Sequence, residues 1–246
     1  MILQIDAGNT RIKWRVLNGS QVVLQGNQLT ATVVDGEPLQ LSGVAALKQA
    51  QLSTVAGDAV VTNLSKQLHD QFGIALHVAE VSAQVGSVSC GYSVPEKLGV
   101  DRWMAVLAVF QKTRQASVVV DVGSAVTVDL ITGDGVHQGG YIVPGIRLLQ
   151  ESLWKGTSQV KVDQLADGNM LNPGTSTDQA VARGCVLMLV ALIERLAKEH
   201  SACLVITGGD GLLLKAQIEA HAIYCADLVL DGLSVEGVRF SLGVHR

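Results

Sequence analysis

Two short segments of the sequence each combine an aspartate with a glycine and small hydrogen-bond donors. They are Asp6-Ala7-Gly8-Asn9-Thr10 and Asp121-Val122-Gly123-Ser124. Glycine lets backbone N–H groups approach an anion closely, and Asn or Ser side chains add uncharged donors. An aspartate next to a phosphate would act through Mg²⁺ or an ordered water. Both segments therefore suit phosphate binding, although the same residue types also form ordinary hairpin turns.

A third segment, Gly99-Val100-Asp101-Arg102-Trp103, opens a predicted helix. A carboxylate such as Asp101 can accept the proton of a substrate hydroxyl group while a phosphoryl group is transferred to the oxygen. An arginine such as Arg102 can bind a substrate carboxylate through two parallel hydrogen bonds. An acidic residue in the first turn is also a common way to begin a helix, so this structural role stays open as well.

Other common nucleotide and metal motifs are missing from the sequence. It contains no GxxxxGK[ST] and no GxGxxG, because Gly133-Asp134-Gly135 is followed by Gln138 where a glycine would be required. The four cysteines are widely scattered, without the spacing of a zinc site or a disulfide framework. If the chain binds ATP, it does so on another scaffold.

The elements expected around the two aspartate segments repeat along the chain. In the first half, strands are predicted at Ile2–Asp6, Ile12–Leu17 and Val22–Leu29, an antiparallel meander rather than a βαβ unit. In the second half, the same pattern returns at Ser117–Val120, Val126–Ile131 and Val136–Val143. When Asp6 is placed on Asp121, Gly8 falls on Gly123 and Asn9 on Ser124. A repeat this far apart indicates one domain copied.

Helices and further strands fill the remaining sequence. Helices are predicted near Val44–Gln51, at Ser65–Phe72 with Ser65 as its cap, at Gly99–Gln115, Ile146–Lys155, Thr177–His200 and Gly211–His221. Strands are predicted at Asp58–Thr62 and at Leu204–Thr207, the latter running into Gly208-Gly209.

Composition narrows the class of protein. Of 246 residues, 48% are hydrophobic and 16% charged, which is typical of a globular protein with a large core. The longest apolar run, Val186–Ile193, is too short to span a membrane, so the apolar excess is expected in a core and a subunit interface. A net charge of −4 without a dense basic run argues against nucleic acid as a partner. The first residues resemble no export signal, so we expect a cytoplasmic protein.

Five motifs in order give the sequence a resemblance to a known family. They are Asp6–Arg11, Gly99–Trp103, Asp121–Ala125, Gly139–Gly145 and Thr207–Gly209. Each is weak singly, but in this order and spacing they resemble the type III pantothenate kinases over essentially the whole chain. The resemblance implies an α/β fold of duplicated actin-like (ribonuclease H-like) domains, here 1–115 and 116–246, with a nucleotide cleft between them. It also implies phosphorylation of pantothenate by ATP, the first step toward coenzyme A.

The resemblance further implies a role for individual residues. The ATP phosphate loop would comprise Asp6, Ala7, Gly8, Asn9, Thr10, Arg11, Ile12 and Lys13, and Ser124 would also reach ATP, which is used with Mg²⁺. Pantothenate would contact Tyr92, Gly99, Val100, Asp101, Arg102 and Thr177, with Asp101 as the proton acceptor. Asp121 would hold the monovalent cation, K⁺ or NH₄⁺, that the family requires. Members of the family are homodimers.

Two alternative functions remain open from the sequence. The chain could be a kinase of the same superfamily acting on a sugar, a short acid or an amino-sugar; Tyr92 together with Gly99–Arg102 argues against this. It could also be a non-catalytic accessory factor for transcription, since proteins of that kind are similar to the family. The presence of all three aspartates, Asp6, Asp101 and Asp121, favours an active enzyme.

Overall fold

The chain divides into two units, which we describe separately. The computed structural model describes residues 1–154 and 170–243. The first unit comprises Met1–Gln111 and the chain from Leu228 onward, and the second comprises Lys112–Asp227. The repeat in the sequence predicts a single boundary near residue 115. The structure divides the chain close to that point and also returns its last segment to the first unit.

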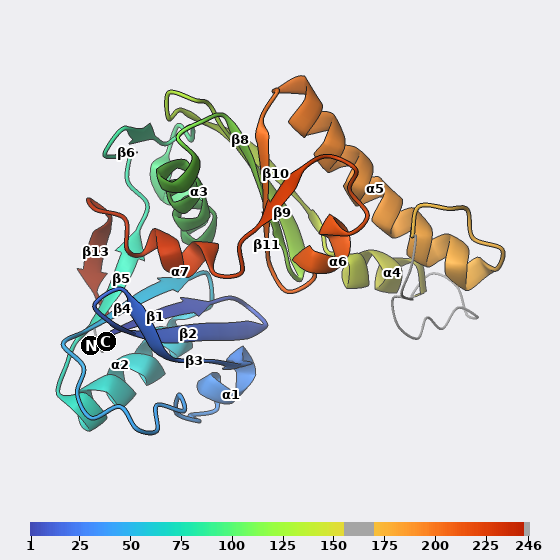
Figure 1. Ribbon diagram of the computed structural model, residues 1–246. Coiled ribbons are helices and arrows are strands. Elements are labelled where there is room, and N and C mark those ends of the chain that lie inside the picture. The colour runs from blue at the N-terminus through green and yellow to red at the C-terminus, as the bar shows by residue number, and fades with distance from the viewer. Residues whose placement is uncertain (155–169, 244–246) are drawn as a thin grey trace. The chain divides into compact units, whose positions relative to one another are not determined.

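The first unit is built on a six-stranded sheet of order β13-β5-β4-β1-β2-β3 (Figure 1). Its strands are β1 (Ile2–Ala7), β2 (Arg11–Asn18), β3 (Gln21–Leu29), β4 (Gln49–Thr54), β5 (Leu76–Glu80) and β13 (Arg239–Leu242). The first three form the predicted antiparallel meander. Strand β4 lies parallel to β1, β5 lies parallel to β4, and β13 closes the edge antiparallel to β5.

Apolar and polar side chains alternate from Leu3 to Ala7 of β1, which gives the sheet of the first unit an apolar face and a polar face. Leu3, Ile5 and Ala7 are fully buried in a core that includes Val60 and Leu64 of α2 (Asp58–Phe72). The intervening residues of β1 lie on the other face, since successive side chains of a strand point in opposite directions. Helix α7 (Leu228–Gly232) packs against β1, and the short α1 (Thr30–Val34) follows β3.

Three predictions in the first unit are wrong. One concerns the parallel strand β4, and two concern the long helix α2. The helix predicted near Val44–Gln51 is absent: residues 44–48 form neither helix nor strand, and Gln49 begins β4, which pairs with β1. The strand predicted at Asp58–Thr62 belongs to α2, which begins after the N-cap Gly57. Ser65 therefore caps no helix; its hydroxyl donates to the carbonyl oxygen of Gly243 at 3.3 Å.

The second unit repeats the arrangement of the first in a five-stranded sheet of order β10-β9-β8-β11-β12. Its strands are β8 (Ser117–Val122), β9 (Ala125–Ile131), β10 (His137–Pro144), β11 (Cys203–Thr207) and β12 (Ala222–Tyr224). As with β1, β2 and β4, the central β8 pairs antiparallel with β9 and parallel with β11. The copied meander is therefore confirmed, and in both units it stands next to a parallel strand that arrives later in the chain.

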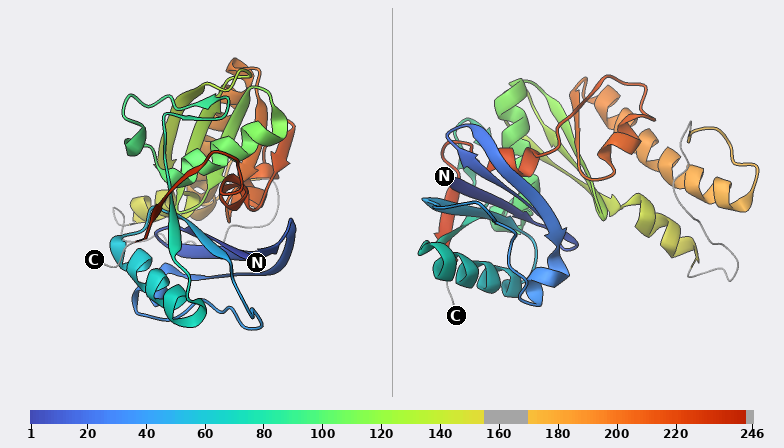
Figure 2. Two further views of the ribbon diagram at one scale, coloured as in Figure 1. Left: turned by 90° about the vertical axis from the view of Figure 1, so that its left-hand side faces the viewer. Right: turned by 60° about the horizontal axis from the view of Figure 1, so that its bottom comes forward.

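Helices complete both units. The second unit contains α4 (Ile146–Trp154), α5 (Thr177–Glu199) and α6 (Gly211–Lys215), and α5 contributes most of the helical residues in the core against β8 and β9 (Figure 2). Helix α6 ends well before the predicted His221, and the predicted helix end at Lys155 lies outside the described residues. Helix α3 (Val100–Thr113), the 3₁₀ turn Pro95–Lys97 and the small ribbon of β6 (Gln84–Val85) and β7 (Val88–Ser89) complete the described elements. Within 1–154 and 170–243, no helix is both long and apolar enough to cross a membrane.

Candidate functional site

The Asp6 turn connects β1 and β2 of the first unit and is held by hydrogen bonds. The backbone N–H of Gly8 donates to the carbonyl of Arg11 at 3.0 Å, which closes the turn. Thr30 binds it twice from the start of α1: its hydroxyl donates to the carbonyl of Gly8 at 2.7 Å, and its N–H donates to the carbonyl of Thr10 at 3.0 Å. The backbone of this turn is therefore fixed before any ligand arrives.

The predicted phosphate loop divides into residues that can present side chains and residues that cannot. Ala7 and Ile12 are fully buried in the core, so only their backbone groups are available to a ligand. Asn9, Thr10 and Arg11 are exposed, and Arg11 donates to the side chain of Asn27 at 3.0 Å. The remaining charged residues of the predicted loop, Asp6 and Lys13, are partly exposed and in register across β1 and β2.

The Asp121 turn of the second unit has a matching construction. The N–H of Gly123 donates to the carbonyl of Ala125, and the N–H of Gly145 donates to the carbonyl of Ser124, both at 3.0 Å. A Cβ atom on Gly145 would lie 2.3 Å from the carbonyl oxygen of Gly123. Such a contact is far inside van der Waals distance, so only glycine fits there. This packing explains the glycine that ends the fourth sequence motif, and it leaves the Ser124 side chain exposed.

The Thr207–Gly209 motif packs directly against the Asp121 turn. Thr207 lies in register with Asp121, and the N–H of Asp210 donates to the carbonyl of Val122 at 3.1 Å. Gly208 has a φ of 93°, and a Cβ atom there would lie 2.4 Å from the Val122 carbonyl oxygen and 2.5 Å from an Asp121 carboxylate oxygen. The tertiary structure thus joins three of the five sequence motifs, because Gly139–Gly145 and Thr207–Gly209 both pack against the Asp121 turn.

Sequence reasoning missed two ionisable residues beside this motif. Burial raises the pKa of the Asp210 carboxyl group. Burial, and next the negative charges of Asp227 and Asp121, raise the pKa of the Tyr224 hydroxyl group, which donates to the carbonyl of Gly208 at 3.3 Å. The parallel pairing of β12 with β11 places Tyr224 beside this motif, and no pattern in the local sequence predicts that pairing.

Tyr92, Asp101 and Arg102, which the sequence predicted to contact substrate, lie together in the first unit. The Oδ1 atom of Asp101 accepts a hydrogen bond from the backbone N–H of Arg102 at 2.8 Å, at the first turn of α3. The Arg102 guanidinium donates to the Tyr92 hydroxyl at 2.9 Å, and its carbon lies 5.7 Å from the centre of the Tyr92 ring. Arg102 is 6% exposed, so its charge is held in a nearly dry environment.

Thr177, the remaining predicted substrate contact, lies in the second unit. It is exposed and is the first residue of α5. The residue that caps this helix is Ser176, whose side chain accepts a hydrogen bond from the N–H of Gln179 at 3.3 Å. A capping role, which the residue type of Thr177 would allow, is therefore filled by its neighbour.

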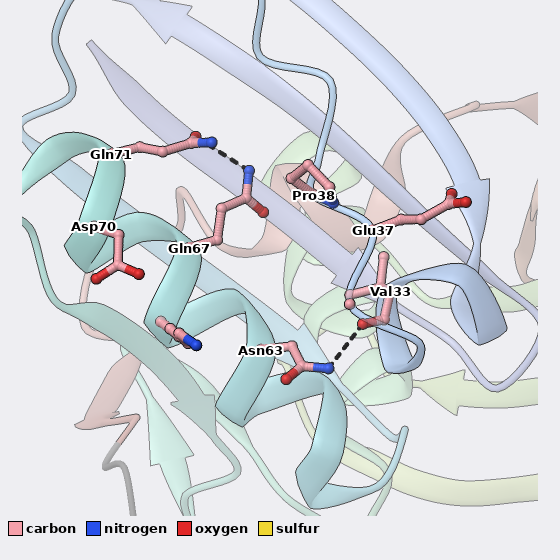
Figure 3. Close-up of a pocket in the computed structure, with 9 residues that line it drawn as sticks. Val33, Glu37, Pro38, Asn63, Gln67, Asp70 and Gln71 are labelled. Atoms are coloured by element: carbon pink, nitrogen blue, oxygen red, sulfur yellow. Dashed lines mark hydrogen bonds between the residues drawn. The ribbon is translucent and has the colours of Figure 1, made fainter.

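A pocket of about 290 Å³ lies between the segment around α1 and helix α2, outside all predicted site residues (Figure 3). Two of its polar side chains, Asn63 and Gln67, bind the protein backbone. Asn63 donates to the carbonyls of Val33 and Val34, each at 2.9 Å. Gln67 accepts from the N–H of Leu39 at 2.9 Å and donates to its carbonyl at 3.2 Å. These bonds fasten the loop after α1 to α2, and we assign the pocket no ligand.

Solved structures of low sequence identity share this fold. A protein of Campylobacter jejuni assigned to the Baf family of transcriptional activators has a TM-score of 0.62 at 22% identity, with 94% of each chain covered. A Sinorhizobium meliloti protein proposed to be a 2-dehydro-3-deoxygalactonokinase has a TM-score of 0.59 at 15% identity, with 95% of each chain covered. These likenesses bear on fold alone, and they confirm the prediction of duplicated actin-like α/β domains.

Proteins found by sequence similarity share a larger fraction of identical residues with this chain. A model of the family described as type III pantothenate kinase matches residues 2–199. The type III pantothenate kinase of Ectopseudomonas mendocina (strain ymp) is 38% identical over 251 residues, which cover 96% of this chain and 98% of that protein. The type III pantothenate kinase of Chromohalobacter salexigens is 36% identical, and the match covers 95% of this chain and 86% of that protein. With five motifs in order and both aspartate turns built alike, the chain belongs to the type III pantothenate kinase family.

Proposed function

We propose that this chain transfers the γ-phosphoryl group of ATP to the primary hydroxyl group of pantothenate. The product is 4'-phosphopantothenate, and the reaction is the first step of coenzyme A biosynthesis. Family membership over nearly the whole chain supports the substrate and the reaction. The structural observation that supports it best is the group of Tyr92, Asp101 and Arg102 at the start of α3.

Asp101 is the proposed proton acceptor. As the new O–P bond forms and the bond to the ADP leaving group breaks, the hydroxyl proton of pantothenate passes to the carboxylate of Asp101. The hydrogen bond from the Arg102 N–H fixes one carboxylate oxygen, so the orientation of Asp101 is set by the helix rather than by solvent. Phosphoryl transfer has a loose transition state, so orienting the hydroxyl matters more than strong basicity. A carboxylate at a helix N-terminus is suited to this task.

Tyr92 and Arg102 are proposed to bind pantothenate, together with the backbone of Gly99 and Val100 and with Thr177. The Arg102 guanidinium donates to Tyr92, and a guanidinium suits a carboxylate because its planar group presents paired donors. Because Arg102 is almost completely buried, its charge is poorly screened and can select an anionic substrate.

The two aspartate turns are proposed to bind the phosphates of ATP. In the first unit these groups are Asp6, the backbone of Ala7, Gly8 and Ile12, and the side chains of Asn9, Thr10, Arg11 and Lys13; in the second unit the group is Ser124. Each turn offers a single carboxylate, and Mg²⁺ is commonly bound by one or two carboxylates together with substrate phosphates and waters. The donor set at Asp6 therefore fits Mg²⁺ carried by ATP, which would neutralise charge on the phosphates.

Asp121 is the proposed ligand of a monovalent cation, K⁺ or NH₄⁺. One oxygen of its carboxylate and the Val122 carbonyl oxygen lie 2.5 Å and 2.4 Å from the position that a Cβ atom on Gly208 would take, so two oxygen atoms of the kind such cations prefer lie around Gly208. Burial, then the charge of Asp227 and then that of Asp121 raise the pKa of the Tyr224 hydroxyl group, so Asp121 lies close enough to act on it electrostatically.

The first test is release of ADP by the purified chain on addition of pantothenate, with ATP and Mg²⁺ present. We expect turnover in K⁺ buffer and a rate lower by about tenfold or more in Na⁺ buffer, because a lost electrostatic contact to the transferring group is costly. Equal chloride concentrations control for ionic strength. Equal rates in both buffers would remove the cation role of Asp121. Absence of turnover in both would point to another substrate or to a non-catalytic function.

We further propose that the chain acts as a homodimer in the cytoplasm, where its co-substrate ATP is made available. An apolar surface of the second unit supports self-association: Ile142 of β10 is 62% exposed, and Met188 of α5 is 57% exposed. Helix α4 packs against both of these elements and adds the exposed Leu148. Apolar residues exposed in this number commonly mark a subunit interface.

Replacement of Met188 by glutamate is expected to convert the dimer to a monomer, because an unpaired charge would be buried at the interface. Light scattering coupled to size-exclusion chromatography measures the mass directly. Val23→Glu is the matched control, since Val23 is 46% exposed on β3 of the first unit. A Met188→Glu protein that keeps the mass of the unaltered dimer would exclude this face from the interface.

A further inference from the structure

The polar face of the sheet in the first unit carries two rows of side chains across β2, β1 and β4. Residues in register on neighbouring strands point to the same face, with strands about 4.8 Å apart. The inner row is Arg15, Gln4 and Gln51, and the outer row, nearer the carboxyl end of β1, is Lys13, Asp6 and Ser53. The outer row thus includes the aspartate to which the proposed function assigns the ATP-bound cation.

The inner row has its polar groups bonded to one another and to the C-terminal segment. Arg15 donates to Gln4 at 2.9 Å, and Gln4 donates to Gln51 at 3.0 Å and to Ser234 at 2.8 Å. Arg15 also forms an ion pair with Asp231 of α7 at 2.8 Å. These hydrogen bonds fix the side chains of the inner row, which lies next to the outer row along the same strands.

Ser53 in the outer row differs from this pattern. Its side chain is fully buried at 0% exposure, and among the described residues its Oγ atom has no hydrogen-bond partner. The adjacent Thr54 shows how a hydroxyl is normally accommodated here: it donates to the carbonyl of Ala7 at 3.2 Å and accepts from the N–H of Ala56 at 3.0 Å. A buried hydroxyl without a partner destabilises the fold, so a chain gains nothing in stability from keeping it.

The duplicated fold places a hydroxyl at the corresponding position of the second unit. There Thr207 of β11 lies in register with Asp121, as Ser53 of β4 lies in register with Asp6. The Thr207 hydroxyl donates to the carbonyl of Ala226 at 3.4 Å. A hydroxyl group therefore lies in register with the aspartate of each turn. The Thr207 hydroxyl has a hydrogen-bond acceptor, whereas that of Ser53 has none among the described residues.

We propose that Ser53 is a positioning residue for Asp6. Rotation about its single side-chain torsion directs the hydroxyl toward the Asp6 carboxylate in the neighbouring strand. When Asp6 faces the cation of Mg·ATP, Ser53 donates a hydrogen bond that fixes which carboxylate oxygen is presented. Ser53 itself touches neither nucleotide nor cation, because it is completely covered. This inference rests on the role of Asp6 in the proposed function.

The test compares Ser53→Ala with Thr54→Val in the full chain. Ser53→Ala should leave the urea midpoint unchanged or raise it, because no bond is lost in the unliganded fold. It should weaken binding of Mg·AMPPNP, measured by calorimetry, by about tenfold, since bonds to charged groups are the stronger ones. The KM for Mg·ATP should rise by a similar factor, and the KM for pantothenate should stay the same. Thr54→Val should lower the urea midpoint.

Two results would overturn the inference. One is a Ser53→Ala protein that binds Mg·AMPPNP as tightly as the unaltered chain, whatever its stability. The other is a lowered urea midpoint with equal increases in both KM values, which would make the hydroxyl a structural group. Because calorimetry needs no phosphoryl transfer, this result is independent of the assay for pantothenate phosphorylation, and failure of the proposed function would be seen separately.

Discussion

Replacement of Asp101 by asparagine is expected to lower kcat by about 10²- to 10⁴-fold, the range over which a general base contributes to catalysis. The amide keeps the size of the side chain and can still accept the Arg102 N–H bond, so α3 should begin as before. It cannot take up a proton. The KM for ATP should change by less than about twofold, because the lost interaction belongs to the transition state. Steady-state kinetics with both substrates varied gives these values.

Asp58→Asn is the matched control for this variant. Asp58 is also an acidic residue in the first turn of a helix of the first unit, α2, and it is exposed. Loss of either charge at a helix N-terminus costs about 0.3–1 kcal/mol in stability. Only Asp101→Asn should affect turnover. If Asp101→Asn turned over pantothenate at a near-normal rate, another group would have to accept the proton.

Replacement of Gly208 by alanine is expected to destabilise the chain by about 3 kcal/mol or more. A non-glycine residue held in a sparsely populated backbone region costs about 1–3 kcal/mol, and Gly208 has a φ of 93°. The added methyl group would also lie 2.4 Å from the Val122 carbonyl oxygen, so the backbone of the Asp121 turn must move. The melting temperature should fall by roughly 6–12 °C for a chain of this size.

The neighbouring glycine provides the control. A Cβ atom on Gly209 would meet nothing within 4 Å, and its φ is not in the positive region. Gly209→Ala should therefore change stability by less than about 0.5 kcal/mol. Equal melting temperatures for Gly208→Ala and Gly209→Ala would show that the motif does not need its close approach to β8. Cation dependence, measured on both proteins, would then report any movement of Asp121.

Local patterns alone predicted much of this fold. The meanders β1–β3 and β8–β10 were found because a half-buried antiparallel strand alternates in sequence and its turns carry glycine. Helix α5 was found because its apolar residues recur at helical spacing, and these residues are buried. Helix α3 was found from the spacing of Met104, Leu107 and Ala108, although the structure buries the whole run from Arg102 to Phe110. Strand β4 and the first part of helix α2 were misassigned, whereas the second part of α2 was predicted as a helix; a short apolar segment can be read either way until its neighbours in space are known.

Some features of the candidate site likewise follow from the sequence, and others follow only from the tertiary structure. The sequence by itself determined the three aspartates, the glycine turns and their order, and through them the family, because these depend on residue type and spacing along the chain. Only the tertiary structure decided that Arg102 binds Tyr92, that Gly208 packs on Val122, and that Ser53 lies beside Asp6. Each of these pairs joins different elements, and the two involving Gly208 and Ser53 depend on parallel strand pairing. A parallel strand reaches its neighbour only after a long connection, so no short-range pattern encodes which residues will meet.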